Sequence, residues 1–436
     1  MLDDLSKKVI SYDAKIAIIG LGYVGLPLAV EFSKLYKTIG FDLNKKRISE
    51  LKNSHDKTNE LSREQLNDAK KLKYTSNVND IEDYNIFIVT VPTPIDSNKD
   101  PDLSMLKDAS NSIGSVLKNG DVVIYESTVF PGATEEICLP ILEKVSGLKL
   151  NKDFYIGYSP ERINPGDKNH NLVNIKKVVS GSNSDAANLI EKLYKSIVKA
   201  GVHKTSSIKI AEAAKVIENT QRDINIALMN ELSIIFDKLN INTEEVLKAA
   251  ETKWNFISFR PGLVGGHCIG VDPYYLTHKA KSVGINPEVI LAGRKINDEM
   301  SIYIADRLIK KMKENQIKID SANILVMGFA FKENCPDHRN TKVIDLIQAL
   351  NKKVSDVFCF DPYVDSDSVY EQYGIKLISK PEFKKYNAVI IAVAHDEFKN
   401  MSLEKIKGLM VSDPIIYDVK NIIKDKTDKA IISWMC

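Results

Sequence analysis

The chain alternates short apolar runs with stretches of helical spacing, beginning close to its first residue. Apolar runs of strand length occur at residues 15–20, 38–42, 86–91, 121–126 and 155–158. The first run ends in glycine and leads into a segment whose apolar residues recur every three or four positions, as in a helix. Strands that alternate with helices predict parallel βαβ units, whose ligands bind beyond the carboxyl ends of the strands. The residues that follow each strand are therefore candidates for function.

One long helix is predicted from about residue 207 to residue 240. Its apolar residues have helical spacing: Ile210, Ala213, Ala214, Ile217, Ile224, Leu228, Leu232 and Ile235. A second alternating series follows, with strands expected at 324–328, 357–361, 388–393 and 415–418. We therefore expect an α/β fold with two Rossmann-like domains joined by a long central helix. A length of 436 residues agrees with this division, because it exceeds what one hydrophobic core usually organises.

Composition and charge exclude several classes of function. The chain is 44% hydrophobic and 27% charged, as in ordinary folded proteins, and its net charge is only +2. Lysine and arginine are dispersed, so the basic stripe of a nucleic-acid-binding protein is missing. No window approaches the roughly 20 apolar residues of a membrane span, and the first residues lack the apolar core of a signal peptide. We expect a cytoplasmic protein without nucleic-acid partners or membrane insertion.

The five cysteines, at positions 138, 268, 335, 359 and 436, show neither CxxC pairs nor regular spacing. This pattern argues against both a metal site and a disulfide framework. Cys268 lies in Gly265-Gly266-His267-Cys268, where the glycines would let a ligand approach the backbone closely. Asp272 would reach a base or a water molecule if this segment is helical. A lone cysteine is more often an inert packing residue. Here the glycine-rich loop favours a functional cysteine instead.

A dinucleotide-binding fingerprint follows the first predicted strand. It is a GxGxxG sequence that opens a helix, and Asp42 ends the second strand about twenty residues later. The helix N-terminus would bind the phosphates, and the carboxylate of Asp42 would bind the adenosine ribose and repel a 2′-phosphate, which predicts NAD as cofactor. The loop residues expected to contact NAD are Gly20, Gly22, Tyr23, Val24 and Gly25.

Three further residues are expected near the cofactor. Arg47 is close enough in sequence to bind a 2′-phosphate, although we expect Asp42 to dominate the preference. Thr93 follows the third strand and Thr128 follows the fourth, so both lie where a nicotinamide or a substrate would bind. Each threonine is explained equally well as an ordinary residue of a turn after a strand.

Four motifs, in this order, make the chain similar to the UDP-glucose/GDP-mannose dehydrogenase family. They are Gly20-Leu-Gly-Tyr-Val-Gly-Leu-Pro, Ser159-Pro-Glu-Arg-Ile-Asn-Pro-Gly, Gly265-Gly-His-Cys-Ile-Gly-Val-Asp and Gly328-Phe-Ala-Phe-Lys-Glu-Asn-Cys-Pro-Asp-His-Arg. The resemblance covers nearly the whole chain. It implies an NAD-binding domain over residues 1–205, a central helical region for dimerisation and the active site over 206–305, and a UDP-sugar-binding domain over 306–436. It also implies a homodimer.

The resemblance assigns chemical roles to single residues. Cys268 matches the nucleophile, Asp272 matches its aspartate partner, and Glu161 matches the glutamate that activates water. Lys215 and Asn219 match a lysine and an asparagine of the central helix, where a spacing of four residues puts both on one face. The other matched residues are Thr128, which positions water, and Lys332 and Arg339, which approach substrate and cofactor. Substrate contacts are also expected at Arg162, Phe256, Ser258, Arg260 and Gly265.

The implied reaction is the four-electron oxidation of a sugar CH2OH group to a carboxylate with two NAD+. Cys268 would capture the aldehyde as a thiohemiacetal, and the second oxidation would give a thioester that water hydrolyses. Lys215 and Asn219 would stabilise negative charge on the reacting oxygen. Asp272, Lys215, or Glu161 acting through water are all open as general base.

The motifs resemble the branch of the family that acts on UDP-N-acetylhexosamines. UDP-GlcNAc and UDP-GalNAc are therefore the favoured substrates, in the service of surface polysaccharide assembly, ahead of UDP-ManNAc and UDP-glucose. Two rivals remain. A two-electron β-hydroxyacid-type dehydrogenase would share the first domain and the helix but would not need Cys268, and a non-catalytic nucleotide-sugar-binding homologue would need none of the catalytic residues.

Overall fold

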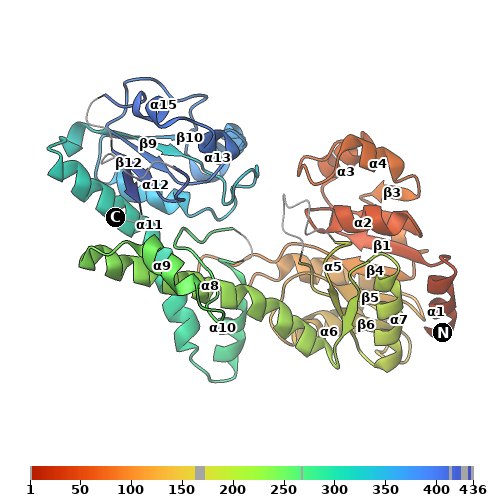
Figure 1. Ribbon diagram of the computed structural model, residues 1–436. Coiled ribbons are helices and arrows are strands. Elements are labelled where there is room, and N and C mark those ends of the chain that lie inside the picture. The colour runs from red at the N-terminus through yellow and green to blue at the C-terminus, as the bar shows by residue number, and fades with distance from the viewer. Residues whose placement is uncertain (1, 163–171, 267–268, 412–414, 424–430, 434–436) are drawn as a thin grey trace. The chain divides into compact units, whose positions relative to one another are not determined.

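The computed structural model describes residues 2–162, 172–266, 269–411, 415–423 and 431–433 (Figure 1). The backbone forms two compact units, one of residues 1–218 and 274–286 and the other of residues 219–273 and 287–436. Two helices contribute to both units, α8 (Ile208–Leu239) and α10 (Asp272–Ser282). This geometric division therefore differs from a simple cut of the sequence into consecutive domains.

The first unit is built on an eight-stranded sheet with the order β3-β2-β1-β4-β5-β6-β7-β8. All neighbouring strands are parallel except β6 and β7. The chain reverses its direction of winding between β1 and β4, which is where Rossmann folds bind their ligands. The strands are β1 (Lys15–Ile19), β2 (Lys37–Phe41), β3 (Leu72–Thr75), β4 (Ile86–Val89), β5 (Val122–Tyr125), β6 (Tyr155–Tyr158), β7 (Lys177–Gly181) and β8 (Val202–Lys204).

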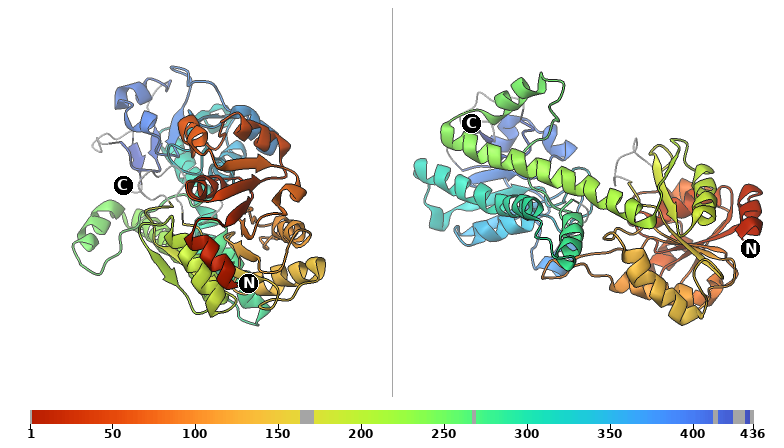
Figure 2. Two further views of the ribbon diagram at one scale, coloured as in Figure 1. Left: turned by 90° about the vertical axis from the view of Figure 1, so that its right-hand side faces the viewer. Right: turned by 90° about the horizontal axis from the view of Figure 1, so that it is seen from below.

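Helices cover both faces of this sheet because its central strands are apolar on both sides. Every residue of β4 and β5 is buried, and α1, α2 and α7 share one hydrophobic core with them. Helices α5 and α6 pack against each other in the same unit (Figure 2). The helices are α1 (Leu2–Ile10), α2 (Gly25–Ser33), α3 (Lys45–Lys52), α4 (Arg63–Asp68), η1 (Val78–Ile81), α5 (Ser104–Gly114), η2 (Thr134–Cys138), α6 (Leu139–Ser146) and α7 (Ser184–Lys195).

The second unit is built on a five-stranded, fully parallel sheet with the order β10-β9-β11-β12-β13. Helices α11 and α12 pack with β9 and β11 into its main core. The strands are β9 (Asn323–Met327), β10 (Asp356–Phe360), β11 (Ala388–Ile391), β12 (Ile416–Asp418) and β13 (Ile431–Ser433). The helices are α9 (Thr243–Glu251), α11 (Glu288–Glu314), η3 (Ile319–Ser321), α12 (Val343–Asn351), α13 (Ser366–Tyr373), α14 (Asp396–Lys399) and α15 (Leu403–Lys407).

The two sheets begin with the same local structure. Gly20 follows β1 with φ +95°, and Gly328 follows β9 with φ +98°. The amide after each glycine donates to the aspartate that follows the neighbouring strand, over 2.9 Å to Asp42 Oδ2 and 2.6 Å to Asp361 Oδ2. In the second unit this carboxylate oxygen also lies 3.0 Å from Nε2 of the buried His395. The second unit thus repeats the turn of the first and adds a buried histidine to it.

The predicted fold class is confirmed, with two Rossmann-like sheets and a long helix between them in the sequence. Every strand expected from an apolar run is present. The strands β3, β7, β8 and β13 were not predicted, because they are short or mix polar with apolar residues. In the described part of the chain, none of the helices has both the length and the apolar character needed to span a bilayer.

Candidate active site

The glycine loop after β1 has the geometry of a phosphate-binding turn. A Cβ atom on Gly25 would lie 1.9 Å from the Gly20 carbonyl oxygen, so a larger residue would push α2 away from the sheet. A Cβ atom on Gly22 would meet no atom within 4 Å, so the loop is open at this residue. Val24, at the N-cap of α2, makes no capping side-chain bond, and Tyr23 and Val24 are both partly exposed. The loop thus leaves space and amide donors for phosphate oxygens.

Asp42 lies beside this loop at the end of β2. Its Oδ2 accepts the amide of Leu21 and its Oδ1 accepts the amide of Asn44, each over 2.9 Å. The side chain remains partly exposed. Because each carboxylate oxygen can accept a second hydrogen bond, Asp42 retains acceptors for the two hydroxyls of a ribose.

Arg47, predicted as a cofactor contact that a 2′-phosphate could use, lies inside the protein. It is only 3% exposed, and its Nη2 pairs with Asp56 over 2.8 Å. Its Nε donates over 2.9 Å to the carbonyl of Leu21, inside the glycine loop. The guanidinium therefore braces the loop from within the protein and is not directed to a 2′-phosphate. Arg47 is close to Asp42 in the sequence, but this closeness does not show in which direction its side chain points.

Thr93 and Thr128 are brought together at the carboxyl ends of β4 and β5. The hydroxyl of Thr93 donates to the carbonyl of Thr128 over 2.7 Å, and both residues are partly buried. The hydroxyl of Tyr275, on α10, donates to the Thr93 carbonyl over 2.8 Å. The two loops are thus joined at the edge of the sheet where a ligand is expected.

Glu161 follows β6 and is 7% exposed. Its Oε1 accepts the amide of Arg162 over 2.6 Å, and its Oε2 accepts Lys177 Nζ over 2.6 Å. Lys177 also donates to Glu126 over 2.7 Å. The side chain of Arg162 pairs with Glu218 on α8. Sequence reasoning missed Lys177 and Glu126. Glu126 was predicted as the last residue of a strand, whereas in the structure it directly follows β5 and so lies at the edge of the sheet where ligands bind.

Lys215 lies on α8 and is only 5% exposed. One turn earlier, Glu212 is fully buried and its carboxylate accepts the amides of Gly132 and Thr134 over 2.5 and 2.9 Å. Burial raises the pKa of Glu212 to about 7, partly offset by these hydrogen bonds. Glu212 therefore anchors the first part of α8 to the loop after β5. It thereby fixes the position of Lys215 relative to that loop.

Asn219 and Asp272 meet in the second unit. Asn219 Nδ2 donates to Asp272 Oδ2 over 2.5 Å, and the two residues are 6% and 1% exposed. Asn219 is one turn after Lys215 along α8, and Asp272 is the first residue of α10. The structure therefore pairs two residues that are 53 positions apart in the sequence.

The glycine loop before Cys268 is fixed to its own unit through hydrogen bonds and close contacts of its backbone. Asn230, on α8, forms hydrogen bonds of 2.8 and 3.1 Å with the amide and carbonyl of Gly262. The amide of Gly266 donates to the carbonyl of Asn340 over 3.0 Å, and a Cβ atom on Gly265 would lie 2.6 Å from the same carbonyl. Gly265 therefore lets a neighbouring backbone approach, and a Cβ atom on Gly266 would lie 2.7 Å from the ring of Phe331. The expected approach of a ligand to this loop stays a prediction. His267 and Cys268 lie outside the described residues.

Two basic residues follow β9. Lys332 is partly buried in the loop that begins at Gly328. The guanidinium of Arg339 forms a two-pronged pair with Asp337, at 3.0 Å from Nε and 2.6 Å from Nη2. Asp337 thereby fixes the direction of Arg339.

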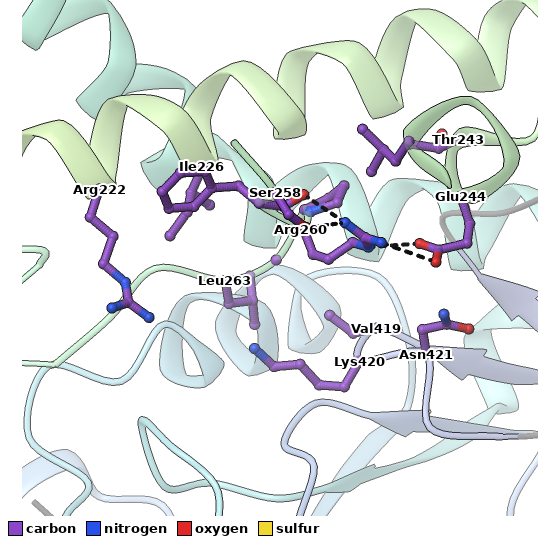
Figure 3. A pocket seen from close by; sticks show the side chains of 14 residues that line it. Arg222, Ile226, Thr243, Glu244, Ser258, Arg260, Leu263, Val419, Lys420 and Asn421 are labelled. Atoms are coloured by element: carbon purple, nitrogen blue, oxygen red, sulfur yellow. Dashed lines mark hydrogen bonds and ion pairs between the residues drawn. The ribbon is translucent and has the colours of Figure 1, made fainter. Parts of the chain in front are cut away.

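A pocket of about 580 Å³ lies in the second unit, between α8, α9, the segment 258–263 and the residues that follow β12 (Figure 3). Of the residues predicted to contact substrate, Ser258 and Arg260 line this pocket, whereas Phe256 does not. Arg260 pairs with Glu244 over 2.8 Å. Sequence reasoning missed two further cations of this pocket, Arg222 and Lys420, because they lie about 200 residues apart in the chain.

Comparisons with known proteins cover nearly the whole chain. Three sequence models of the UDP-glucose/GDP-mannose dehydrogenase family match, the NAD binding domain at residues 14–198, the central domain at 209–299 and the UDP binding domain at 325–425. A UDP-N-acetyl-D-glucosamine 6-dehydrogenase of Pseudomonas aeruginosa is 58% identical over 95% of this chain and 99% of its own length. One of Salmonella typhi is 56% identical over 94% and 97%. The solved structure of a UDP-D-ManNAc dehydrogenase from Pyrococcus horikoshii has a TM-score of 0.88 at 35% identity, over 96% and 98% of the two chains.

Proposed function

Because this chain belongs to the UDP-glucose/GDP-mannose dehydrogenase family, we propose that it oxidises the C6 hydroxymethyl group of a UDP-N-acetylhexosamine to a carboxylate. It is an NAD-dependent UDP-sugar dehydrogenase. We favour UDP-GlcNAc over UDP-GalNAc, since relatives 56% and 58% identical are named UDP-N-acetyl-D-glucosamine 6-dehydrogenases. UDP-ManNAc and UDP-glucose are the next alternatives. The product would serve surface polysaccharide assembly.

The buried pair of Asn219 and Asp272 is the observation that carries this proposal. Leaving an amide and a carboxylate out of water costs free energy, so a protein that only bound a nucleotide sugar would gain little from them. Both residues flank the expected chemistry, Asn219 one turn after Lys215 and Asp272 four residues after Cys268. This arrangement suits an enzyme in which Asn219 stabilises negative charge on an oxygen and Asp272 accepts a proton from a thiol.

We assign the UDP portion to the pocket of Figure 3. Arg222, Arg260 and Lys420 give it three cations for a diphosphate, and Phe259 and Leu263 give it apolar surface for a base. Burial lowers the pKa of Lys420, partly offset by Glu333. An anionic ligand would favour its charged form, so phosphate binding and protonation of Lys420 would support each other.

We assign NAD to the first unit, with the pyrophosphate on the loop from Gly20 to Gly25 and the adenosine ribose on Asp42. The described loop fits this group, because it leaves Gly22 open and α2 without a capping side chain. NAD+ supplies the acceptor for a hydride. Within the chain, we retain residues 1–205, 206–305 and 306–436 as the NAD-binding, central and UDP-sugar-binding regions. The enzyme would work in the cytoplasm, where NAD+ and nucleotide sugars are available.

The protein's own residues would then act in three steps. Lys215 and Asn219 would stabilise the oxygen at C6 as the hydroxyl proton and the first hydride leave. The thiolate of Cys268 would add to the aldehyde, and loss of the second hydride from this thiohemiacetal would leave a thioester. Water activated by Glu161 would cleave the C–S bond to give carboxylate and free thiol. Overall, one alcohol, two NAD+ and one water give one carboxylate, two NADH and three protons.

The ratio of NADH formed to UDP-sugar consumed tests this function. We expect two NADH per UDP-GlcNAc, because both oxidations are completed before the product leaves. UDP-GalNAc, UDP-ManNAc and UDP-glucose, assayed in the same way, would rank the substrates by kcat/KM. A ratio of one would indicate a two-electron dehydrogenase, and binding without NADH would indicate a non-catalytic homologue.

We also propose a homodimer formed through α8. Leu228, Ile235 and Leu239 lie on one helical face, at spacings of seven and four, and are 48%, 45% and 59% exposed. Covering such a stripe with its own copy is the common solution for a soluble protein. Sedimentation velocity should therefore show a dimer that Leu228→Glu shifts toward monomer. Val289→Glu, on α11, changes a valine that is 68% exposed and should leave the dimer intact. A wild-type protein that sediments as an active monomer would refute the dimer.

A further inference from the structure

An ion cluster is buried next to Glu161 in the first unit. Lys177, the first residue of β7, donates to Glu161 over 2.6 Å and to Glu126 over 2.7 Å. The side chains of Lys177, Glu126 and Glu161 are only 4%, 0% and 7% exposed. We propose that Lys177 is a positioning residue for thioester hydrolysis, which keeps Glu161 ionised and holds its carboxylate in one orientation. This inference rests on the proposed role of Glu161 as the base that activates water.

The contacts of Glu161 fix its carboxylate. Lys177 binds one oxygen, and the amide of Arg162 binds the other over 2.6 Å. A carboxylate with a donor on each oxygen cannot rotate about its last bond without losing one of them. The remaining lone pairs are then held in fixed directions, as a base that must meet a single water molecule requires.

Lys177 is itself fixed by two groups that do not contact a substrate in our assignment. Its ammonium group lies 5.3 Å from the ring centre of Tyr194, on α7. The hydroxyl of Tyr194 donates to Glu126 Oε1, while Glu126 Oε2 accepts Lys177. Tyr194 and Glu126 therefore hold the ammonium group that also binds Glu161. The cluster joins β5, β6, β7 and α7 at the carboxyl end of β5 and β6.

The charges of the cluster do not balance when both glutamates are ionised. Two carboxylates then face one ammonium, and an excess charge is costly in a buried place. Burial raises the pKa of Glu126 to about 7, with Lys177 opposing and Glu161 adding to the effect. Burial lowers the pKa of Lys177, but the two glutamates outweigh it, so this pKa is raised overall. Near neutral pH, a proton on Glu126 can therefore remove the excess negative charge of the cluster. Glu161 then remains ionised.

Other titratable groups on the neighbouring elements are already engaged. Tyr158, on β6, donates its hydroxyl to the carbonyl of Ser127 over 3.1 Å. The side chain of Arg162 pairs with Glu218, and both are partly exposed. Lys177 is thus the cation in direct contact with both buried carboxylates among the described residues.

Lys177→Met tests the inference, because methionine has a similar length and no charge. We expect this variant to form two NADH per active site in a fast burst and then to hydrolyse the thioester slowly at neutral pH. Without the ammonium the two glutamates share a proton, so Glu161 becomes protonated at higher pH. The hydrolysis rate falls on the acid side of its pH profile (the acid limb), and the midpoint of this fall should therefore rise by about one to three pH units. The rate should recover at alkaline pH.

A second substitution separates charge from structure. In Lys177→Met with Glu126→Gln, the like charge beside Glu161 is removed as well, so the acid limb should return most of the way to its wild-type position. In Glu126→Gln alone, the midpoint of the acid limb should lie at or below the pH at which it lies in the wild type. Thermal unfolding and NAD binding, measured on each variant, would show whether the fold is retained. The double variant lacks a repelling pair and should fold even if Lys177→Met does not.

Three results would overturn the inference. They are an unchanged pH profile in Lys177→Met, an equal loss at every pH, and a loss that Glu126→Gln does not rescue. Infrared difference spectra provide a readout without turnover, since a buried carboxyl should protonate at higher pH in Lys177→Met than in the wild type. The proposed role of Glu161 fails separately, if Glu161→Gln hydrolyses the thioester at the wild-type rate.

Discussion

Replacing Cys268 with alanine is expected to abolish uronate formation and to leave NAD binding nearly unchanged. Without the thiol the aldehyde cannot form a thiohemiacetal, so the carbon that must lose the second hydride is not made tetrahedral. We expect a loss of about 10³-fold or more in uronate formation, since nucleophile and partners act as a unit. At most one NADH should form per active site. Uronate can be measured by mass spectrometry, and NAD binding by fluorescence titration.

Cys359→Ala is the matched control for this experiment. Cys359 lies on β10 and is 1% exposed, in the main core of the second unit. Its removal should cost about 1 kcal/mol of stability, as small core truncations do, and two NADH per sugar should still form. Uronate formation by Cys268→Ala within tenfold of the wild-type rate would eliminate covalent catalysis.

Glu161→Gln is expected to separate oxidation from hydrolysis. Both hydride transfers can proceed without activated water, whereas the thioester cannot be released rapidly. The loss of one general base typically costs on the order of 10²–10⁴ in the affected step. We therefore expect a rapid burst of about two NADH per active site, set by the two-hydride chemistry, followed by slow turnover. Intact-protein mass spectrometry should detect the sugar attached to Cys268.

Glu218→Gln is the control for the loss of a carboxylate in this region. Glu218 pairs with the side chain of Arg162, whereas Glu161 accepts the amide of the same residue. This variant should show normal turnover without a burst. If Glu161→Gln loses the burst and forms no adduct, Glu161 would act in substrate binding or in the first oxidation.

The fold was predictable because most of its strands correspond to short, local runs of apolar residues. The runs that became β1, β4, β5, β9 and β11 are almost entirely buried, and a buried parallel strand reads as an unbroken apolar run. The strand β8, Val202–Lys204, was missed because only its first residue is half-buried and the other two are exposed. Such edge strands owe their conformation to a neighbour, which the local sequence does not reveal.

The site was predictable only where a motif fixes a position. The fingerprint located Gly25, where a Cβ atom would meet the carbonyl oxygen of Gly20, and Asp42, which accepts the amide of Leu21 in the glycine loop. The binding of a ribose to Asp42 stays a prediction. The direction of Arg47 could not be read, since its partner Asp56 was not identifiable from sequence. Lys177 looks like any surface lysine in the sequence. Its partner Glu126 is 51 residues away, and only the order of strands brings the two together.

The turn that opens the second sheet has a consequence for how the cofactor must be used. Asp361 accepts four backbone amides, those of residues 329, 330, 363 and 364, and His395 Nε2 lies 3.0 Å from it. Since His395 Nδ1 accepts the amide of Asn334, its Nε2 carries the proton and donates to Asp361. Asp361 thus has no lone pair left to accept a hydrogen bond from a ribose. Asp42, in contrast, accepts only two amides and is partly exposed, so it can still accept hydrogen bonds from a ribose.

Within the described part of the chain, this turn cannot serve as a second copy of the NAD site at the glycine loop after β1. The two oxidations must then take place in succession, with NADH leaving and fresh NAD+ entering between them. During that exchange the half-oxidised sugar needs to be retained. The bond to Cys268 would therefore act as a tether as well as an activating group, and it would prevent a reactive aldehyde from diffusing away while the dinucleotide is replaced.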